Sequence, residues 1–310
     1  MALGTSVGHF TLYAWRHSSR INVLRNCSWF ILLLLLQACQ SSNEQSSASD
    51  VATDSTMQIA DSTVSTDLIW HFESEFEPEF KDTLKLWVNT VKEACFETLG
   101  DYPFTMNIFF HKSDSRQKEG VTFGHTDRAP STRGLHLYVI DQSSYESLIS
   151  DWIAPHEMSH LAIRPVGRNN KWFAEGFATY LSRRIMIRLG YYSEAEFEEM
   201  YATKIAATKP FYEVDYSFSD RSAELFEEYR YSTVYWAGAG FFYWADKELQ
   251  KNSNMRFEEL LQEYQIVGRN QDTNFAQLIK SWDEIAGYKL FDQLMVEYRN
   301  GSSREIMNRF

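Results

Sequence analysis

The sequence predicts an α+β fold in which a small mixed-sheet lobe, residues 67–149, precedes a mostly helical lobe, residues 150–310. Short apolar runs separated by turn-rich segments are typical of strands, and they end before residue 150. From there nearly every segment repeats apolar residues with a helical period. The 310 residues are 44% hydrophobic and 15% aromatic, enough to bury one large core or two modest ones.

Residues 1–38 have the pattern of a lipoprotein signal peptide. Arginines without acids precede an apolar run that is far shorter than the roughly 20 residues needed to cross a bilayer. The following LQAC resembles the bacterial lipobox, which implies lipidation of Cys39 as the mature N-terminus. A plain secretory signal cut after Ala38 or later is the alternative. The resemblance implies a lipid anchor in the bacterial cell envelope, and Gln40 favours the outer membrane.

Residues 39–66 predict a flexible tether. This segment is rich in Ser, Thr, Asp and Gln and has few large apolar residues, so burial cannot offset the entropy lost on ordering it. The folded domain is therefore expected at residues 67–310.

The charge balance argues against a nucleic-acid partner. The chain has 30 Lys and Arg against 42 Asp and Glu, a net charge of −12, whereas nucleic-acid binding needs a basic surface. Of the three cysteines, only Cys95 lies in the expected domain, on the apolar face of a predicted helix. We therefore expect it to be buried and unpaired.

The first lobe is expected to combine one long helix with a small sheet. Its predicted strands are 67–72, 104–111, a weaker one at 120–124, and 134–140. Apolar residues recur with a 3.6-residue period from Phe80 to Leu99. Gly100 follows at once, and glycine suits the end of a helix.

The second lobe opens with two helices. Ser150 or Asp151 can cap the first, and a segment containing proline and glycine ends it. The next helix is expected from about Trp172 to Leu189. A later segment, SEAEFEEM, has the spacing of a capping box. Further runs with helical periodicity are 222–250, 256–265, 273–286 and 288–299.

The segment APHEMSHLAIRPVGRNNKWFAEGFATY contains a candidate metal site. His156 and His160 are four residues apart, so on a helix they share one face. Glu157 lies about 100° round the same helix, near a bound metal but badly placed to bind it. A catalytic zinc takes three protein ligands, and Glu175 on the next helix can supply the third. The alternative, an amphipathic helix with solvated histidines, does not account for that glutamate.

HEMSH followed by WFAEGFATYL resembles the gluzincin zinc metallopeptidases, whose catalytic domain is thermolysin-like. The match is closest to the aminopeptidase N and glycyl aminopeptidase group and the related peptidase-MA-like domains. YSTVYWAGAGFFYWADKEL resembles the downstream helix of this family, in which a catalytic tyrosine precedes a glycine by three residues. The resemblance covers about residues 105–300.

The resemblance implies a role for each matching residue. One Zn²⁺ per chain would be bound by His156, His160 and Glu175. Glu157 would be the general base for a metal-activated water. Tyr235 would donate a hydrogen bond to the developing oxyanion, and Tyr231 is the alternative donor. Without the resemblance, Tyr235 would be interpreted as a tyrosine of the hydrophobic core.

One departure from the family concerns substrate recognition. Its exopeptidases carry a G-x-M-E-N-like segment whose glutamate holds the free amine of the substrate, but TDRAPSTRGLHLYVI has no glutamate. Amine recognition is therefore not supported. We expect an extended peptide to pair with the strand at 135–140 by edge addition. Asp127 and Arg133 lie nearby, and contact with substrate is one interpretation of them, but solvated loop charges are the favoured one. The remaining histidines of this lobe are interpreted as surface or sheet residues: His71, His111, His125 and His136.

The expected function is zinc-dependent hydrolysis of peptide or protein substrates by a membrane-anchored enzyme. A non-catalytic peptide-binding lipoprotein with the same fold is the main alternative, and a zinc hydrolase acting on a non-peptide bond is a third. Degenerate peptidases usually lose a ligand or the base first, whereas this chain retains all four residues of its motifs.

Overall fold

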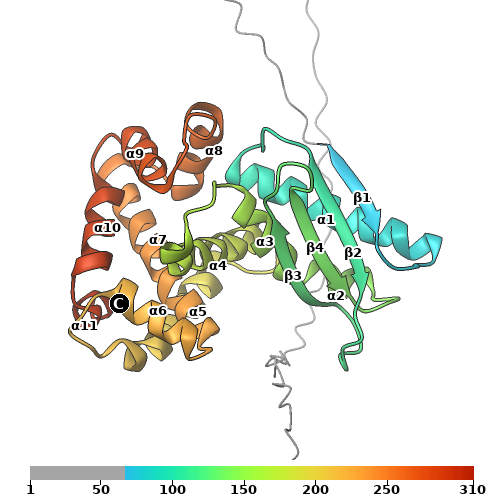
Figure 1. The fold of residues 1–310 in the computed structure, drawn as a ribbon, viewed down its shortest axis with the longest axis horizontal. Helices are drawn as coiled ribbons and strands as arrows, with labels where there is room; N and C mark the ends of the chain where they lie inside the picture. The colour runs from blue at the N-terminus through green and yellow to red at the C-terminus, as the bar shows by residue number, and fades with distance from the viewer. Residues whose placement is uncertain (1–66) are drawn as a thin grey trace, which may run out of the picture. The chain divides into compact units, whose positions relative to one another are not determined.

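A computed structural model describes residues 67–310 of the chain. The predicted signal peptide at residues 1–38, the lipidation site Cys39 and the tether at residues 39–66 lie outside the described residues. The described chain is 61% helical and forms a small four-stranded sheet followed by helices, which confirms the predicted α+β class (Figure 1).

The sheet is mixed, with strand order β1-β2-β4-β3. Its strands are β1 (Leu68–Phe72), β2 (Met106–Lys112), β3 (Val121–Asp127) and β4 (Gly134–Val139). β1, β2 and β4 are parallel, and β3 is antiparallel to β4. The prediction that a peptide adds to the strand at 135–140 is wrong, because β4 already hydrogen-bonds a strand on each side. The edge strand of this half of the sheet is β3.

One face of the sheet is buried against the long helix α1 (Pro78–Leu99), which crosses behind the strands in Figure 1. The buried positions of β2 are Met106, Ile108 and Phe110, and the ring of Phe110 lies 6.5 Å from that of Trp87 on α1. α1 also packs against helices of the second lobe, so one hydrophobic core extends through both lobes. Cys95 on α1 is buried, as predicted, and forms no disulfide within residues 67–310.

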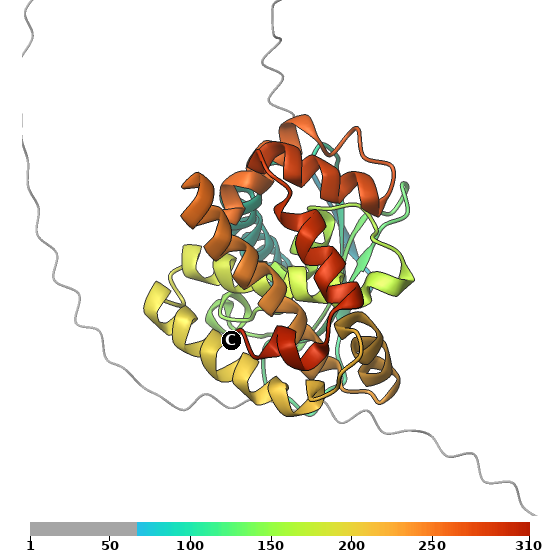
Figure 2. The same cartoon turned by 90° about the vertical axis from the view of Figure 1, so that its left-hand side faces the viewer.

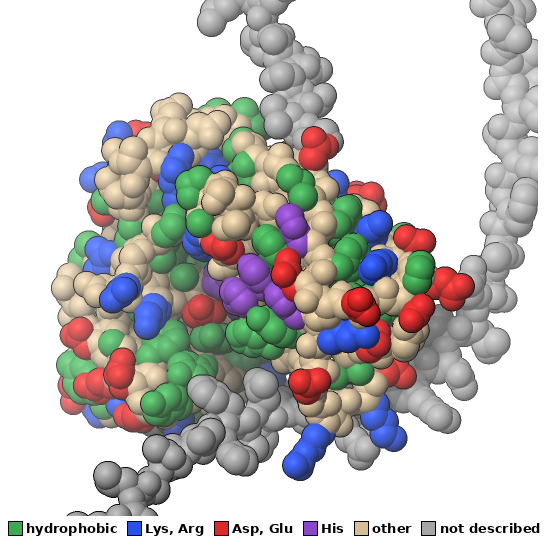
Figure 3. Space-filling view, turned by 45° about the vertical axis from the view of Figure 1, so that its right-hand side comes forward, with side chains coloured by type: hydrophobic (Ala, Val, Ile, Leu, Met, Phe, Trp, Pro, Cys, Tyr) green, Lys and Arg blue, Asp and Glu red, His purple; other side chains and the backbone are tan. Residues whose placement is uncertain are grey.

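The opposite face of the sheet carries a row of stacked rings, one from each strand. His71, Phe109, His136 and His125 stack with centroid distances of 4.3 to 4.5 Å. These histidines are sheet residues, as predicted, and histidine side chains come to the surface on one face of the molecule (Figure 3). Burial lowers the pKa of His136, and the charges of its neighbouring histidines lower it further.

The second lobe is built from helices around the central pair α4 and α7 (Figures 1 and 2). Its helices, after the short α2 (Tyr145–Ile149), are α3 (Ile153–Leu161), α4 (Lys171–Arg188), α5 (Glu194–Thr208), α6 (Phe218–Glu227), α7 (Tyr231–Ser253), α8 (Phe257–Val267), α9 (Phe275–Ala286), α10 (Leu290–Asn300) and α11 (Ser303–Met307). Two 3₁₀ turns cover Arg168–Asn170 and Lys209–Tyr212. No helix within residues 67–310 is long and apolar enough to cross a membrane.

Most predicted helices are confirmed to within a few residues, and one is corrected. Ser193 and Glu196 form the predicted capping box at the start of α5. The single run predicted at 222–250 is two helices, because α6 ends at Glu227 and α7 begins at Tyr231. Tyr229 between them has a φ of 59°, a left-handed conformation that interrupts a helix.

Candidate metal centre

The structure brings His156, His160 and Glu175 together at the contact between α3 and α4. The Nε2 atoms of His156 and His160 lie 3.3 and 3.5 Å from Oε2 of Glu175. The two histidines are only 4% and 8% exposed. Within residues 67–310, these three residues form a group whose ligand atoms all lie within 4.8 Å of one another and could hold a metal ion.

The spacing of the three ligand atoms fits a small metal ion. Tetrahedral ligands about 2.1 Å from an ion lie about 3.4 Å from one another, which matches the two nitrogen–oxygen distances. A direct N–H···O hydrogen bond is usually about 2.9 Å long, so both contacts are long for hydrogen bonds. Two imidazole nitrogens and one carboxylate oxygen suit a divalent transition metal ion and leave a fourth position open.

Both local sequence and packing orient the first two ligands. α3 begins at Ile153 with Trp152 as its N-cap and no side-chain cap, so the prediction that Ser150 or Asp151 caps this helix is wrong. Asp151 lies one residue before the N-cap, and its Oδ1 accepts a hydrogen bond of 2.7 Å from the backbone N–H of Ile153. The four-residue spacing then places both imidazoles on one face of the helix. Nδ1 of His156 is buried and has no hydrogen-bond partner among the described residues. Its ring is held instead by packing, with the ring of Trp152 edge-on at 5.2 Å.

The surroundings of the Glu175 carboxyl favour its ionised form. Burial acts to raise the pKa of the Glu175 carboxyl, but the polar contacts with His156 and His160 and the charges of these two histidines lower it by more. The net effect places this pKa well below its usual range. Glu175 therefore offers a carboxylate, the form that binds a metal ion.

Two glycines let α4 and α7 approach closely beside this centre. A Cβ atom on Gly176 would lie 2.3 Å from the carbonyl carbon of Gly238, and one on Gly238 would lie 2.4 Å from the carbonyl oxygen of Trp172. Since real Cβ contacts are never that short, only glycine fits at both positions. Glu175 precedes one glycine and Tyr235 lies one turn before the other, so this contact sets them next to each other.

Tyr235 lies beside the candidate metal centre. Its ring centroid is 6.0 Å from that of His156, at an angle of 22°. Burial, followed by the negative charges of Glu175 and Glu157, raises the pKa of its hydroxyl well above the usual range. The hydroxyl therefore stays protonated and can donate a hydrogen bond. Tyr231, one turn earlier, is 39% exposed and packs against Phe226.

Glu157 is held by a residue that the sequence did not reveal. Its carboxylate Oε2 accepts a hydrogen bond of 2.8 Å from Oγ1 of Thr126 on β3. The same hydroxyl lies 2.9 Å from the Glu157 carbonyl oxygen. The sequence predicted this strand only to residue 124, and so placed Thr126 in a loop. Its extension to Asp127 brings the edge of the sheet alongside α3.

The two charged residues predicted in the loop between β3 and β4, Asp127 and Arg133, differ in their contacts. Asp127 accepts hydrogen bonds from the backbone N–H of Ala129 and from Oγ1 of Thr132, so it stabilises the turn after β3. Arg133 lies in a loop, as predicted, but it is only partly exposed. Its guanidinium lies 4.5 Å from the centroid of the Phe104 ring and is half-buried, because the turn folds back over the end of α3.

Comparison with known proteins adds no assignment. No family model matches this sequence, and no curated protein matches it. The chemistry of the centre is therefore inferred from its own residues and their geometry.

Proposed function

We propose that this protein is a zinc-dependent peptidase of the gluzincin type, with a thermolysin-like, peptidase-MA-like catalytic domain. The observation that carries the proposal is the convergence of three metal-binding side chains with Glu157 and Tyr235 at one place between α3, α4 and α7. A metal-binding group alone supports only binding. A carboxylate and a protonated hydroxyl beside it supply the two further groups that amide hydrolysis needs.

Each of these side chains has a defined task in the proposed reaction. A bound Zn²⁺ would supply a water of lowered pKa and polarise the substrate carbonyl. Glu157, oriented by Thr126, accepts a proton from the attacking water and delivers it to the leaving amine. Tyr235 donates a hydrogen bond to the carbonyl oxygen as negative charge develops on it, an interaction that is strongest in the transition state.

We also propose that a peptide or protein substrate is bound in an extended conformation along β3. This strand is at the edge of the sheet, and its residue Thr126 contacts the proposed base. Backbone hydrogen bonds to an edge strand hold an extended peptide without selecting its sequence. A lipid on Cys39 would keep this domain at a bacterial membrane, with the outer membrane favoured.

Metal content and peptide hydrolysis together test the proposed function. We expect one Zn²⁺ per purified chain and cleavage within a broad peptide library, both lost on chelation and restored by zinc. Glu175→Gln is expected to lower zinc occupancy, because a carboxylate ligand is replaced by a neutral amide. Glu199→Gln, an exposed position on α5, is the matched control. A chain that holds zinc but cuts no peptide would favour the peptide-binding lipoprotein instead.

Tyr235→Phe is expected to lower kcat/KM for peptide cleavage about a hundredfold without changing zinc content. Loss of one oxyanion donor typically costs that much. The change removes only a hydroxyl from a ring that lies beside His156. Tyr231→Phe serves as the comparison, since its side chain is more exposed. A larger loss in Tyr231→Phe than in Tyr235→Phe would assign the oxyanion donor to Tyr231.

A further inference from the structure

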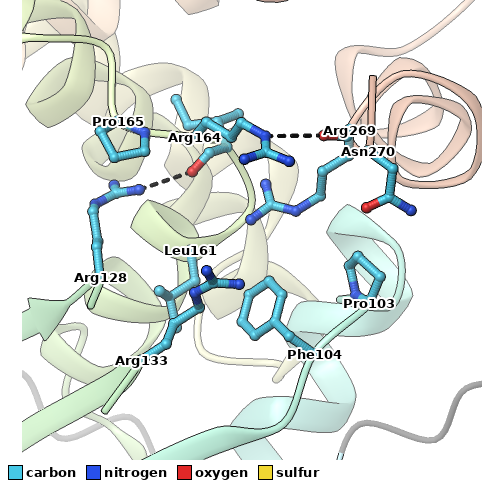
Figure 4. A pocket seen from close by; sticks show the side chains of 10 residues that line it. Pro103, Phe104, Arg128, Arg133, Leu161, Arg164, Pro165, Arg269 and Asn270 are labelled. Carbon is cyan, nitrogen blue, oxygen red and sulfur yellow. Dashed lines mark hydrogen bonds between the residues drawn. The ribbon is translucent and has the colours of Figure 1, made fainter. Parts of the chain in front are cut away.

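A small cavity lined by four arginines lies at the C-terminal end of α3. Its volume is about 110 Å³, several times the roughly 30 Å³ that a water molecule occupies in the liquid. The arginines come from three separate segments: the turn between β3 and β4, the loop after α3, and the turn after α8. They are Arg128, Arg133, Arg164 and Arg269. Figure 4 shows the side chains of all four grouped around the same space.

Within the described part of the chain, these four guanidinium groups lack acidic partners. Among residues 67–310, no carboxylate lies within 4.0 Å of any of them. Other arginines of the same domain are paired, for example Arg184 with Glu194 and Glu258. The whole chain carries 42 acidic residues against 30 basic ones, so the missing carboxylates at this cluster do not reflect a shortage of acidic residues. The cavity is a local concentration of positive charge in an acidic protein.

Burial makes this concentration of charge unfavourable without a ligand. Arg269 is only 6% exposed. Burial lowers the pKa of Arg128 and of Arg269 to about 10 each, and the two charges oppose each other. Buried cations in proteins are usually paired, because an unpaired charge loses its hydration without compensation. An anion in the cavity would relieve both the burial and the repulsion.

The fold uses only part of the hydrogen-bonding capacity of these side chains. Arg128 donates to the Ile163 carbonyl at 2.8 Å, and Arg269 donates to the Ala162 carbonyl, so both cap the end of α3. Each guanidinium has five N–H groups, and these bonds occupy one each. The guanidinium of Arg133 makes no hydrogen bond or ion pair with any described residue and lies over the ring of Phe104. Helix capping therefore does not account for Arg133.

The cavity is close to the candidate metal centre. Its wall includes Leu161, which directly follows the proposed ligand His160. Arg128 is two residues from Thr126, the partner of Glu157, and the charge of Arg128 interacts with those of Glu157 and Glu175. A peptide lying along β3 at the metal centre would therefore run towards these arginines.

We propose that the four-arginine cavity is an anion-binding subsite that holds a carboxylate of the substrate, either its C-terminal carboxylate or an Asp or Glu side chain. The inference rests on the proposed function, because it takes the ligand to be a peptide at the metal centre. Guanidinium groups bind carboxylates through parallel, charge-assisted hydrogen bonds. The site therefore selects acidic or C-terminal segments of the substrate.

Peptide binding to the full chain carrying Glu157→Gln tests this subsite without turnover. Labelled hexapeptides would be compared in matched pairs: free C-terminus against carboxamide, and Glu against Gln at each position in turn. We expect at least one charged peptide to bind about tenfold more tightly than its uncharged partner. Arg133→Gln is expected to abolish that preference, and Arg133→Lys to retain part of it. Arg116→Gln, which removes an exposed arginine of the same lobe that has no ion pair within residues 67–310, should retain it in full.

Two results would overturn the proposed subsite. One is equal binding of charged and uncharged peptides by the chain that carries Glu157→Gln alone, and the other is an unchanged preference after Arg133→Gln is added. Inorganic phosphate separates a substrate subsite from a free-anion site. If phosphate binds the parent but not Arg133→Gln, and does not compete with charged peptides, the assignment to substrate is wrong. The proposed function is judged separately, by hydrolysis in the chain that retains Glu157. If the protein prefers charged peptides but hydrolyses none, the anion-binding subsite is supported and the proposed enzymatic function is contradicted.

Discussion

Replacement of Glu157 by Gln is expected to lower peptide hydrolysis by about 10²- to 10⁴-fold while zinc content stays at one per chain. The amide has the shape of the carboxylate, and its oxygen can still accept the hydrogen bond from Thr126. It cannot accept a proton from water. Because the three proposed metal ligands are unchanged, this single substitution separates the proposed metal binding from the proposed catalysis.

The measurement is kcat/KM on peptides that the parent cleaves, together with zinc content of the same preparations. Glu199→Gln on the surface of α5 is the control for loss of one acidic group. Retention of parental hydrolysis in Glu157→Gln would show that another group accepts the proton. Loss of zinc along with hydrolysis would show instead that the carboxylate supports the metal site, and the assignment of a base would then lack evidence.

The helices and the shared helical face of the two histidines could be predicted because the relevant signals are local. A spacing of four residues places His156 and His160 on one helical face whatever the rest of the fold does. Ser193 and Glu196 form their capping box within one turn. Helical periodicity does not locate the end of a helix when the apolar pattern continues into the next helix. The segment around Tyr229 contains no proline or glycine, so the end of α6 there could not be seen from the sequence.

The residues that the sequence missed depend on contacts between distant segments. The strand order decides that Thr126, rather than a residue of β4, lies beside Glu157. Likewise, Arg128 and Arg269 are 141 positions apart and meet only because the turns after β3 and α8 both reach the end of α3. No motif marks such residues. Tyr235 was found only through the resemblance, and its place beside Glu175 follows from helix packing.

Gly238→Ala is expected to disturb the packing of α4 against α7 and to lower both stability and hydrolysis. The added Cβ would lie 2.4 Å from the Trp172 carbonyl oxygen and 3.2 Å from the Cα of Gly176, both backbone atoms that no side-chain rotation can move. α4 and α7 must separate. Overpacking of this kind typically costs about 1–3 kcal/mol of unfolding free energy, which would lower the unfolding temperature by several degrees.

Hydrolysis is expected to fall more steeply than stability, because separation of the two helices moves Tyr235 away from Glu175. A displacement of about 1 Å at a catalytic centre can cost about a hundredfold in rate. The matched control is Gly240→Ala on the same helix, which brings the same gain in helix propensity. The three atoms nearest to its added Cβ all belong to the side-chain ring of Phe310, the closest at 3.0 Å. Thermal unfolding, zinc content and kcat/KM would be compared for the two variants. If Gly238→Ala matched Gly240→Ala in all three, the close approach of the helices would not be what positions the tyrosine.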